Sequence, residues 1–68
     1  MTDHVYKIED FVGSSSEGQD AAIRNAIARA ARAHAKLRWF VVTESRGQIV
    51  DGSVSHWQVT VRVGIAMD

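Results

Sequence analysis

Residues 53–66, near the end of the chain, form a strand-like segment in which apolar and polar side chains alternate strictly from His56 to Val63. The apolar row consists of Trp57, Val59, Val61, Val63 and Ile65. The polar row consists of His56, Gln58, Thr60 and Arg62. A period of two is typical of a strand with one buried face, so this segment predicts a strand whose valine row packs against the rest of the domain.

Residues 39–50 form a second strand-like segment, which Asp51 and Gly52 separate from the third. An Asp-Gly pair between two such segments is the strongest two-residue signal for a hairpin. Counting back from this turn places Phe40 opposite Val63, so both side chains should face the helix. Trp39 falls on the other face, where a large indole would be exposed in a single copy.

An earlier strand is predicted at residues 5–12, where the pattern is that of a half-buried segment. One face carries Tyr6, Ile8 and Val12, and the other carries Val5, Lys7, Glu9 and Phe11. The serine-rich segment that follows predicts a helix start, either at Ser14 with Glu17 as a capping box or at Ser16. The chain is therefore expected to form a strand, a helix and two further strands.

The helix is predicted at residues 16–37 and is unusually rich in alanine. Eight of the fifteen residues from Ala21 to Ala35 are alanine. One stripe at helical spacing comprises Ile23, Ile27, Ala30, Ala31, His34 and Leu37. Alanine is the best helix former and gives the smallest helix surface, so a twisted sheet could curl closely around this helix.

Length and composition favour self-association. Sixty-eight residues indicate a single domain, 1–68, near the lower limit for an independent hydrophobic core. The chain has no cysteine, and His4, His34 and His56 lack the spacing of metal ligands, so no metal site is expected. Without these stabilising elements, oligomerisation is the remaining common way to stabilise so short a chain.

Charge and hydropathy exclude two classes of partner. Eight basic and eight acidic residues cancel, which argues against a nucleic-acid binder. No apolar run approaches the roughly 20 residues of a membrane span, and no signal peptide is apparent. We therefore expect a soluble cytoplasmic protein without a nucleic-acid or membrane partner.

Trp39 and Gln58 are the candidate ligand-binding residues. The simple hairpin register puts them on one face but six positions apart, about 20 Å at ~3.3 Å per residue. An indole and an amide suit a planar heterocycle, yet they can meet only between different copies of the chain. The alternatives are that Trp39 caps the end of the core or lies in a subunit interface, and that Gln58 is simply solvated.

Arg46 is a third candidate, near the outer end of the hairpin. The simple register pairs it with Trp57, on which it could stack, or it could reach an anionic group. His34 is expected to be a packed, hydrogen-bonded histidine. No catalytic constellation emerges, so the chain is not expected to be an enzyme.

Several short motifs, in order along the chain, resemble those of the dodecin family of small flavin-binding proteins. They are Val-Gly-Ser-Ser at 12–15, Ala-Ala-Ile at 21–23, Ala-Ile-Ala-Arg-Ala at 26–30, Arg-Trp-Phe at 38–40, Arg-Gly at 46–47, Gln-Val-Thr at 58–60 and Val-Gly at 63–64. Each is weak alone, but their order and spacing over residues 4–64 are specific.

The resemblance implies an α+β fold of β-α-β-β order, with a three-stranded antiparallel sheet wrapped around one helix. Twelve copies would form a hollow homododecamer with six sites, each holding two stacked flavins between symmetry-related tryptophans. Trp39 would be the stacking residue, Gln58 would bind the pyrimidine edge, and Arg46 would lie near the flavin tail or phosphate. FMN is the implied ligand, with riboflavin or lumichrome as alternatives and coenzyme A as a possible second ligand.

The implied role is flavin storage or scavenging with quenching of photochemistry, and not catalysis. The chain departs from the family pattern at Ala66, where many relatives carry a basic residue, and this puts tail recognition in doubt more than ring binding. Two other functions remain open on the sequence: a purely structural homo-oligomer and a flavin-dependent redox enzyme.

Overall fold

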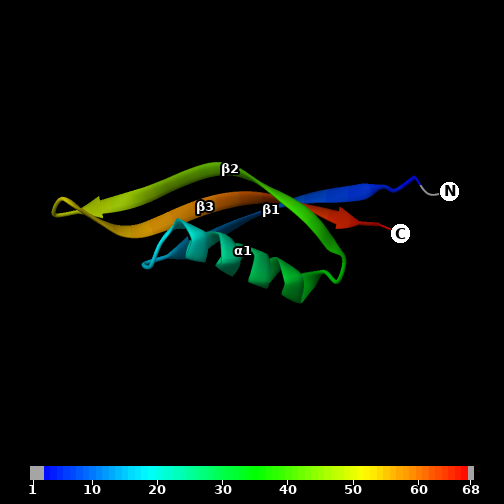
Figure 1. Ribbon diagram of the computed structural model, residues 1–68, viewed down its shortest axis with the longest axis horizontal. Coiled ribbons are helices and arrows are strands. Elements are labelled where there is room, and N and C mark those ends of the chain that lie inside the picture. The colour runs from blue at the N-terminus through cyan, green and yellow to red at the C-terminus, as the bar shows by residue number, and fades with distance from the viewer. Residues whose placement is uncertain (1–2, 68) are drawn as a thin grey trace.

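The computed structural model describes residues 3–67 and contains one helix and three strands. These are β1 (Tyr6–Ser15), α1 (Gln19–Ala33), β2 (Leu37–Val50) and β3 (Ser53–Ala66). The strands form one antiparallel sheet in the order β1-β3-β2, and α1 lies across one of its faces (Figure 1). The predicted β-α-β-β fold of the α+β class is confirmed.

The hairpin of β2 and β3 turns at the predicted Asp-Gly pair. Asp51 and Gly52 have φ angles of 54° and 80°. A type I′ turn requires positive φ at both central residues, and glycine adopts it without strain. The tip of this hairpin projects well past β1 and α1 (Figure 1), which makes the domain elongated, 56 by 20 by 13 Å.

The core lies between β3 and the alanine face of α1. Val59, Val61, Val63 and Ile65 are buried there, as are Ala22, Ala26 and Ala30. The helix packs mainly on β1 and β3 and hardly touches β2. Its close approach depends on small residues, because a Cβ at Gly13 of β1 would collide with the carbonyl oxygen of Ala22.

The predicted thin helix is confirmed, but its buried stripe is rotated from the predicted one. Ala22 and Ala26, which the predicted stripe omits, lie at the centre of the contact. Ile23 and Ile27 flank it and are partly buried, while Ala31 is exposed. Close packing on the backbone at Gly13 favours the smallest side chains at the centre, so the isoleucines are displaced to the rim.

The predicted helix ends are wrong. The helix begins after Gly18, which supplies no side-chain cap, and it ends at Ala33 because His34 is already extended. Ser14 belongs to β1, which continues to Ser15 by pairing with β3. The Ser15 hydroxyl accepts a hydrogen bond from the Glu17 backbone N–H at 2.9 Å, so the serines form a turn before the helix instead of capping it.

The hairpin register shifts at three points, at Arg38, Thr43 and Ser55, and the last two bound a segment that is displaced by one residue. The predicted pairs Trp39–Gly64 and Phe40–Val63 are confirmed. Closer to the turn, Ser55 of β3 has no partner, and further along Thr43 of β2 has none. Their hydroxyls bond back into the ladder: Ser55 Oγ donates to the Gln48 carbonyl at 3.4 Å and Thr43 Oγ1 donates to the Thr60 carbonyl at 3.3 Å.

Between these two irregularities, the predicted pairs of Arg46 with Trp57 and of Gln58 with Ser45 are wrong. Arg46 lies opposite Gln58, and Ser45 lies opposite Val59 on the helix side, where Gln19 of α1 donates to its hydroxyl. The reason is that an extra residue on one strand exchanges which side chains share a face until a second one restores the count.

The end of α1 is tied to β1 by a small ionic cluster. Glu9 accepts from Lys7 at 3.0 Å and contacts the His34 ring nitrogen Nε2 at 2.9 Å. The hydrogen bond from Lys7, followed by that from His34, lowers the pKa of the Glu9 carboxyl. The expectation of a packed, hydrogen-bonded His34 is confirmed.

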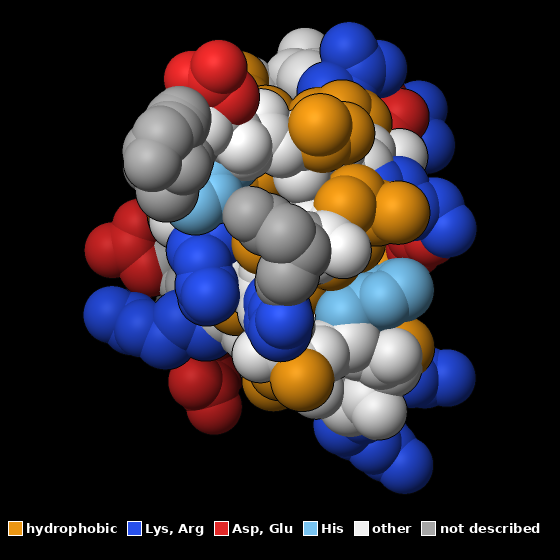
Figure 2. Space-filling model, turned by 90° about the vertical axis from the view of Figure 1, so that its right-hand side faces the viewer, with side chains coloured by type: hydrophobic (Ala, Val, Ile, Leu, Met, Phe, Trp, Pro, Cys, Tyr) orange, Lys and Arg blue, Asp and Glu red, His pale blue; other side chains and the backbone are white. Residues whose placement is uncertain are grey.

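The described part of the chain has no helix long and apolar enough to cross a membrane. The expected cytoplasmic location stays a prediction. Figure 2 looks at the end where both termini lie and shows apolar, basic and acidic side chains interspersed over it. This mixture accords with the balance of charge in the sequence.

Candidate functional site

The candidate residues all lie on the sheet face turned away from α1, which we call the helix-free face. Its residues are Tyr6, Ile8, Asp10, Val12 and Ser14 of β1, Trp39, Val41, Glu44, Arg46 and Gln48 of β2, and His56, Gln58, Thr60, Arg62 and Gly64 of β3. They alternate with the core-facing residues along most of each strand, and no helix or other strand of residues 3–67 packs over this face. Several are large and apolar, and each of those is exposed.

Trp39 lies at the end of this face where the chain termini lie. Its indole rests directly over Gly64, since a Cβ at that glycine would overlap the ring. Tyr6 meets the indole edge-on, with ring centroids 6.4 Å apart and an angle of 66° between the planes. The indole nevertheless remains 41% exposed. An aromatic surface held in place from below and from one side is suited to stacking with a second planar ring.

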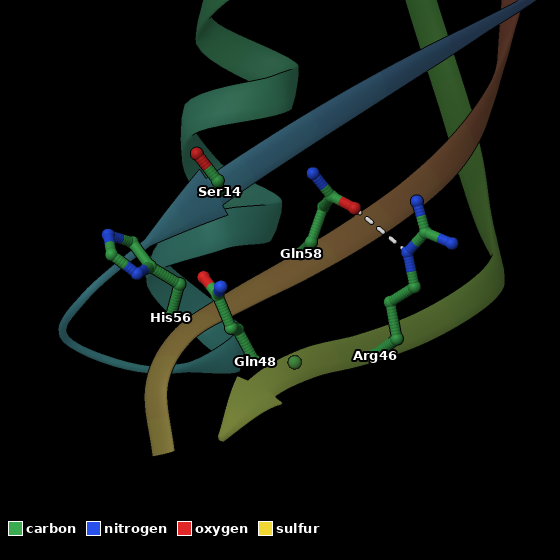
Figure 3. A pocket seen from close by; sticks show the side chains of 6 residues that line it. Ser14, Arg46, Gln48, His56 and Gln58 are labelled. Carbon is green, nitrogen blue, oxygen red and sulfur yellow. Dashed lines mark hydrogen bonds between the residues drawn. The ribbon is translucent and has the colours of Figure 1, made fainter. Parts of the chain in front are cut away.

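Gln58 lies towards the other end, at a cavity of about 360 Å³. Side chains from all three strands line it, and Figure 3 shows Ser14, Arg46, Gln48 and His56 around Gln58. Arg46 Nε donates to Gln58 Oε1 at 2.8 Å (Figure 3). Of the two alternatives for Arg46, stacking on Trp57 is wrong, because Trp57 points to the helix side and packs against the core.

An ion pair occupies the middle of the face, between the Trp39 and Gln58 ends. Arg62 donates from Nε and Nη2 to the two carboxylate oxygens of Asp10, at 3.0 and 3.3 Å. This paired hydrogen bonding lowers the pKa of the Asp10 carboxyl and raises that of Arg62. Because each charge is satisfied by the other, the middle of the face carries no net charge from these two residues.

Trp39 and Gln58 do not meet within one copy. Trp39 lies opposite Gly64, and Gln58 is six residues further along β3, about 20 Å at ~3.3 Å per residue. The predicted separation on a shared face is therefore confirmed, although Gln58 pairs with Arg46 and not with Ser45. A ligand that needs both the indole and the amide would have to lie between two copies.

Sequence reasoning missed three contributors to the site. Gly64 was a family motif residue without a role, yet its missing side chain makes room for the indole. The sequence predicts Ser14 as a helix cap and His56 as a polar strand residue only, but both line the cavity around Gln58. The alternation of His56 with Trp57 was the available signal, since it already put His56 and Gln58 on one face.

Comparison with known proteins identifies the family. The dodecin family model matches residues 5–68. The curated dodecin of Thermus thermophilus is 44% identical over 64 residues, covering 94% of this chain and 93% of that protein.

Solved structures agree with this match. Dodecin from Streptomyces davaonensis superposes with a TM-score of 0.91 at 51% identity, covering 98% of both chains. Dodecin from Streptomyces coelicolor superposes with a TM-score of 0.91 at 47% identity, covering 100% of this chain and 97% of that one. A Thermus thermophilus dodecin variant with a substituted tryptophan gives 0.90 at 41% identity, covering 97% of this chain and 98% of that one. The chain described here belongs to the dodecin family.

Proposed function

We propose that twelve copies of this chain form a hollow shell that stores flavin, FMN or riboflavin, in pairs stacked between Trp39 side chains of neighbouring copies. Membership of the dodecin family supports a small flavin-binding protein and a homo-oligomer in general. The stoichiometry, the ligand and the storage role are the parts that we infer beyond it.

One observation carries the proposal: the two ring-binding candidates share a face but lie about 20 Å apart in one copy. The exposed Trp39 indole offers a stacking surface without a ligand-facing amide beside it. The Gln58 amide offers hydrogen bonds at a cavity whose lining residues include no tryptophan, tyrosine or phenylalanine. Assembly would bring an indole from one copy to an amide from another, and so complete the site.

The exposed apolar side chains support the assembly. Tyr6, Ile8, Val12, Trp39 and Val41 are each more than a third exposed on the helix-free face. On the other side of β2, Phe40 is 47% exposed because α1 hardly covers this strand. Apolar surface on both sides of a short chain favours burial between copies in a closed assembly.

The proposed role is that of a binding protein and not of an enzyme. Stacked contact between a flavin and an electron-rich indole gives a fast electron-transfer route that competes with fluorescence and with damaging photochemistry. A stored flavin would therefore be dark and photochemically inert. Coenzyme A as a second ligand stays a prediction.

Titration of apoprotein with riboflavin and with FMN tests this function. We expect flavin fluorescence to fall steeply to an end point of one flavin per chain, in a particle of about 90 kDa for twelve chains of 7.5 kDa. Unchanged fluorescence at saturating protein would contradict stacking on Trp39. A colourless shell that binds no flavin would favour the structural oligomer, and sustained oxidation of an added electron donor would favour the redox enzyme.

A further inference from the structure

Arg46 makes one side-chain hydrogen bond in the described part of the chain, and its acceptor is the amide of Gln58. The bond runs from Nε to Oε1 at 2.8 Å. A guanidinium has five N–H donors and no acceptor, so an amide can meet it only with its oxygen. The contact therefore fixes which end of the Gln58 amide faces Arg46, and Figure 3 shows Nε2 directed away from the arginine.

The backbone register is what makes this contact possible. Without the unpaired Ser55, Arg46 would lie opposite Trp57 and its side chain would leave the sheet on the helix side. With it, Arg46 and Gln58 are direct partners in the ladder and leave the sheet on the same face. Opposite residues in an antiparallel pair have their Cβ atoms within about 5.5 Å, which is close enough for the two side chains to bond.

The described charged groups near Arg46 offer it no alternative partner. Among residues 3–67 no carboxylate forms an ion pair with it, in contrast to Arg62 on the same face. The guanidinium is exposed, so it gains little from burial. Its hydrogen bond to a neutral amide is charge-assisted and therefore stronger than one between two neutral groups.

From this arrangement we propose that Arg46 is a positioning residue that acts through Gln58 and not on the ligand tail. By holding Oε1, it presents the Nε2 donors and leaves one oxygen lone pair free, so that the amide offers a donor beside an acceptor. That pattern complements a ring edge with a carbonyl next to an N–H. The inference rests on the proposed function for its ligand, but the contact itself exists without one.

A double-mutant cycle measured with riboflavin tests the role, because riboflavin carries no phosphate. We expect Arg46→Met to weaken riboflavin binding about fivefold, as for the loss of one net hydrogen bond. In a Gln58→Ala background the same Arg46→Met change should alter riboflavin affinity less than about twofold, since the amide that it orients is gone. Gln48→Ala, which alters the same cavity lining, is the matched control background, and there the fivefold effect should persist.

The alternative role for Arg46 gives a different pattern. If the guanidinium bound the ligand tail, Arg46→Met would weaken FMN much more than riboflavin and would do so equally with or without Gln58. Either equal losses of riboflavin affinity in the two backgrounds or a loss confined to FMN would overturn the proposal. Equal losses of FMN and riboflavin in the parent chain, abolished by Gln58→Ala, would support it.

A measurement without flavin separates this inference from the proposed function. In ligand-free protein, we expect the Arg46 Nε–H to exchange with water several-fold more slowly than an unbonded arginine N–H, and Gln58→Ala to remove that protection while Gln48→Ala does not. Unchanged exchange in Gln58→Ala would overturn the positioning role. If the parent protein binds no flavin, the proposed function fails, and this exchange measurement alone decides whether Arg46 holds Gln58.

Discussion

The two ends of the helix-free face prepare their side chains by different means. At one end, the Trp39 indole can lie over the sheet because Gly64 beneath it has no side chain. At the other end, the Gln58 amide is placed by a partner, because Arg46 opposite it donates to its oxygen. Stacking needs an unobstructed flat surface, whereas hydrogen bonding needs a fixed direction, and each end supplies what its kind of contact requires.

The pairing of β2 with β3 also differs between the two ends. From Trp39 to Val42 the hairpin keeps the simple register counted from the turn, although Arg38, directly before Trp39, is unpaired. Around Arg46 and Gln58 it is shifted by one residue between the unpaired Ser55 and Thr43. An unpaired residue redirects a side chain, which is why such irregularities are frequent beside binding sites.

Trp39→Ala should have the largest effect on ligand binding. It removes the stacking surface, which by analogy with base stacking on aromatic side chains is worth about 1–3 kcal/mol. We expect flavin affinity to fall by that amount and most of the fluorescence quenching to disappear, both read from one fluorescence titration. Val41→Ala on the same strand and face is the control and should leave quenching intact. Full quenching in Trp39→Ala would mean that another group stacks on the flavin.

Sequence reasoning described the Trp39 end well for a physical reason. The turn at Asp51 and Gly52 sets which residues of β2 and β3 lie opposite each other. Pairs counted from the turn are correct wherever both strands have the same number of residues between the pair and the turn. The Gln58 end was mispaired because nothing in the local pattern marks Ser55 or Thr43 as unpaired. A serine and a threonine in a strand look ordinary, and only the three-dimensional curvature of the sheet makes one extra residue favourable at each point.

The sequence predicts that the helix packs closely on the sheet, but it does not predict which residues lie at the centre of the contact. High alanine content indicated close packing, which Ala22, Ala26 and Ala30 provide. The hydrophobic pattern favoured Ile23 and Ile27 as its centre, because hydrophobicity measures how much a side chain gains from burial and not how closely two backbones approach. Gly13 allows the close approach of the helix to β1. Its position opposite the helix follows from the three-dimensional fold and cannot be seen in the local sequence pattern.

Gly64→Ala should have the next largest effect, because it fills the space under the indole. The added methyl group would overlap the Trp39 ring, which must swing away from its place beside Tyr6. We expect weaker flavin binding with incomplete quenching, and a shift in indole emission in the ligand-free protein. Gly18→Ala is the matched control, since a Cβ there meets nothing within 4 Å. Unaltered indole emission and flavin affinity in Gly64→Ala would show that the glycine does not position the ring.

Gln58→Ala should have a smaller effect and should separate affinity from quenching. Each hydrogen bond lost is worth about 0.5–1.5 kcal/mol, so flavin should dissociate more readily. The flavin that remains bound should stay quenched, because Trp39 is untouched. Ile49→Ala, at an exposed residue that does not line the cavity, should change neither quantity. Loss of quenching for bound flavin in Gln58→Ala would make the amide part of the stacking geometry and would erase the contrast between the two ends.

Acid should produce the smallest effect, and it should act on stability through the ion pair of Asp10 and Arg62 that lies between the two ends. The pKa of Asp10 is lowered by its hydrogen bonds from Arg62, so the folded state binds its proton less readily than the unfolded chain does. This contribution to stability is therefore complete above about pH 4, the ordinary range for an aspartate, and is lost as the pH falls further. Glu9, whose pKa is also lowered, adds a contribution of the same sign.

Asp10→Asn isolates the Asp10 part of that acid response. The asparagine keeps the shape of the side chain but cannot titrate, so thermal unfolding of this variant should depend less steeply on pH below about 4 than that of the parent chain. Its midpoint near neutral pH should be only slightly lower, because an exposed ion pair contributes little. Val12→Ala, on the same face, removes no titrating group, so it is the control and should keep the parental slope. An identical pH slope in Asp10→Asn and the parent would mean that the Arg62–Asp10 pair does not couple protons to folding.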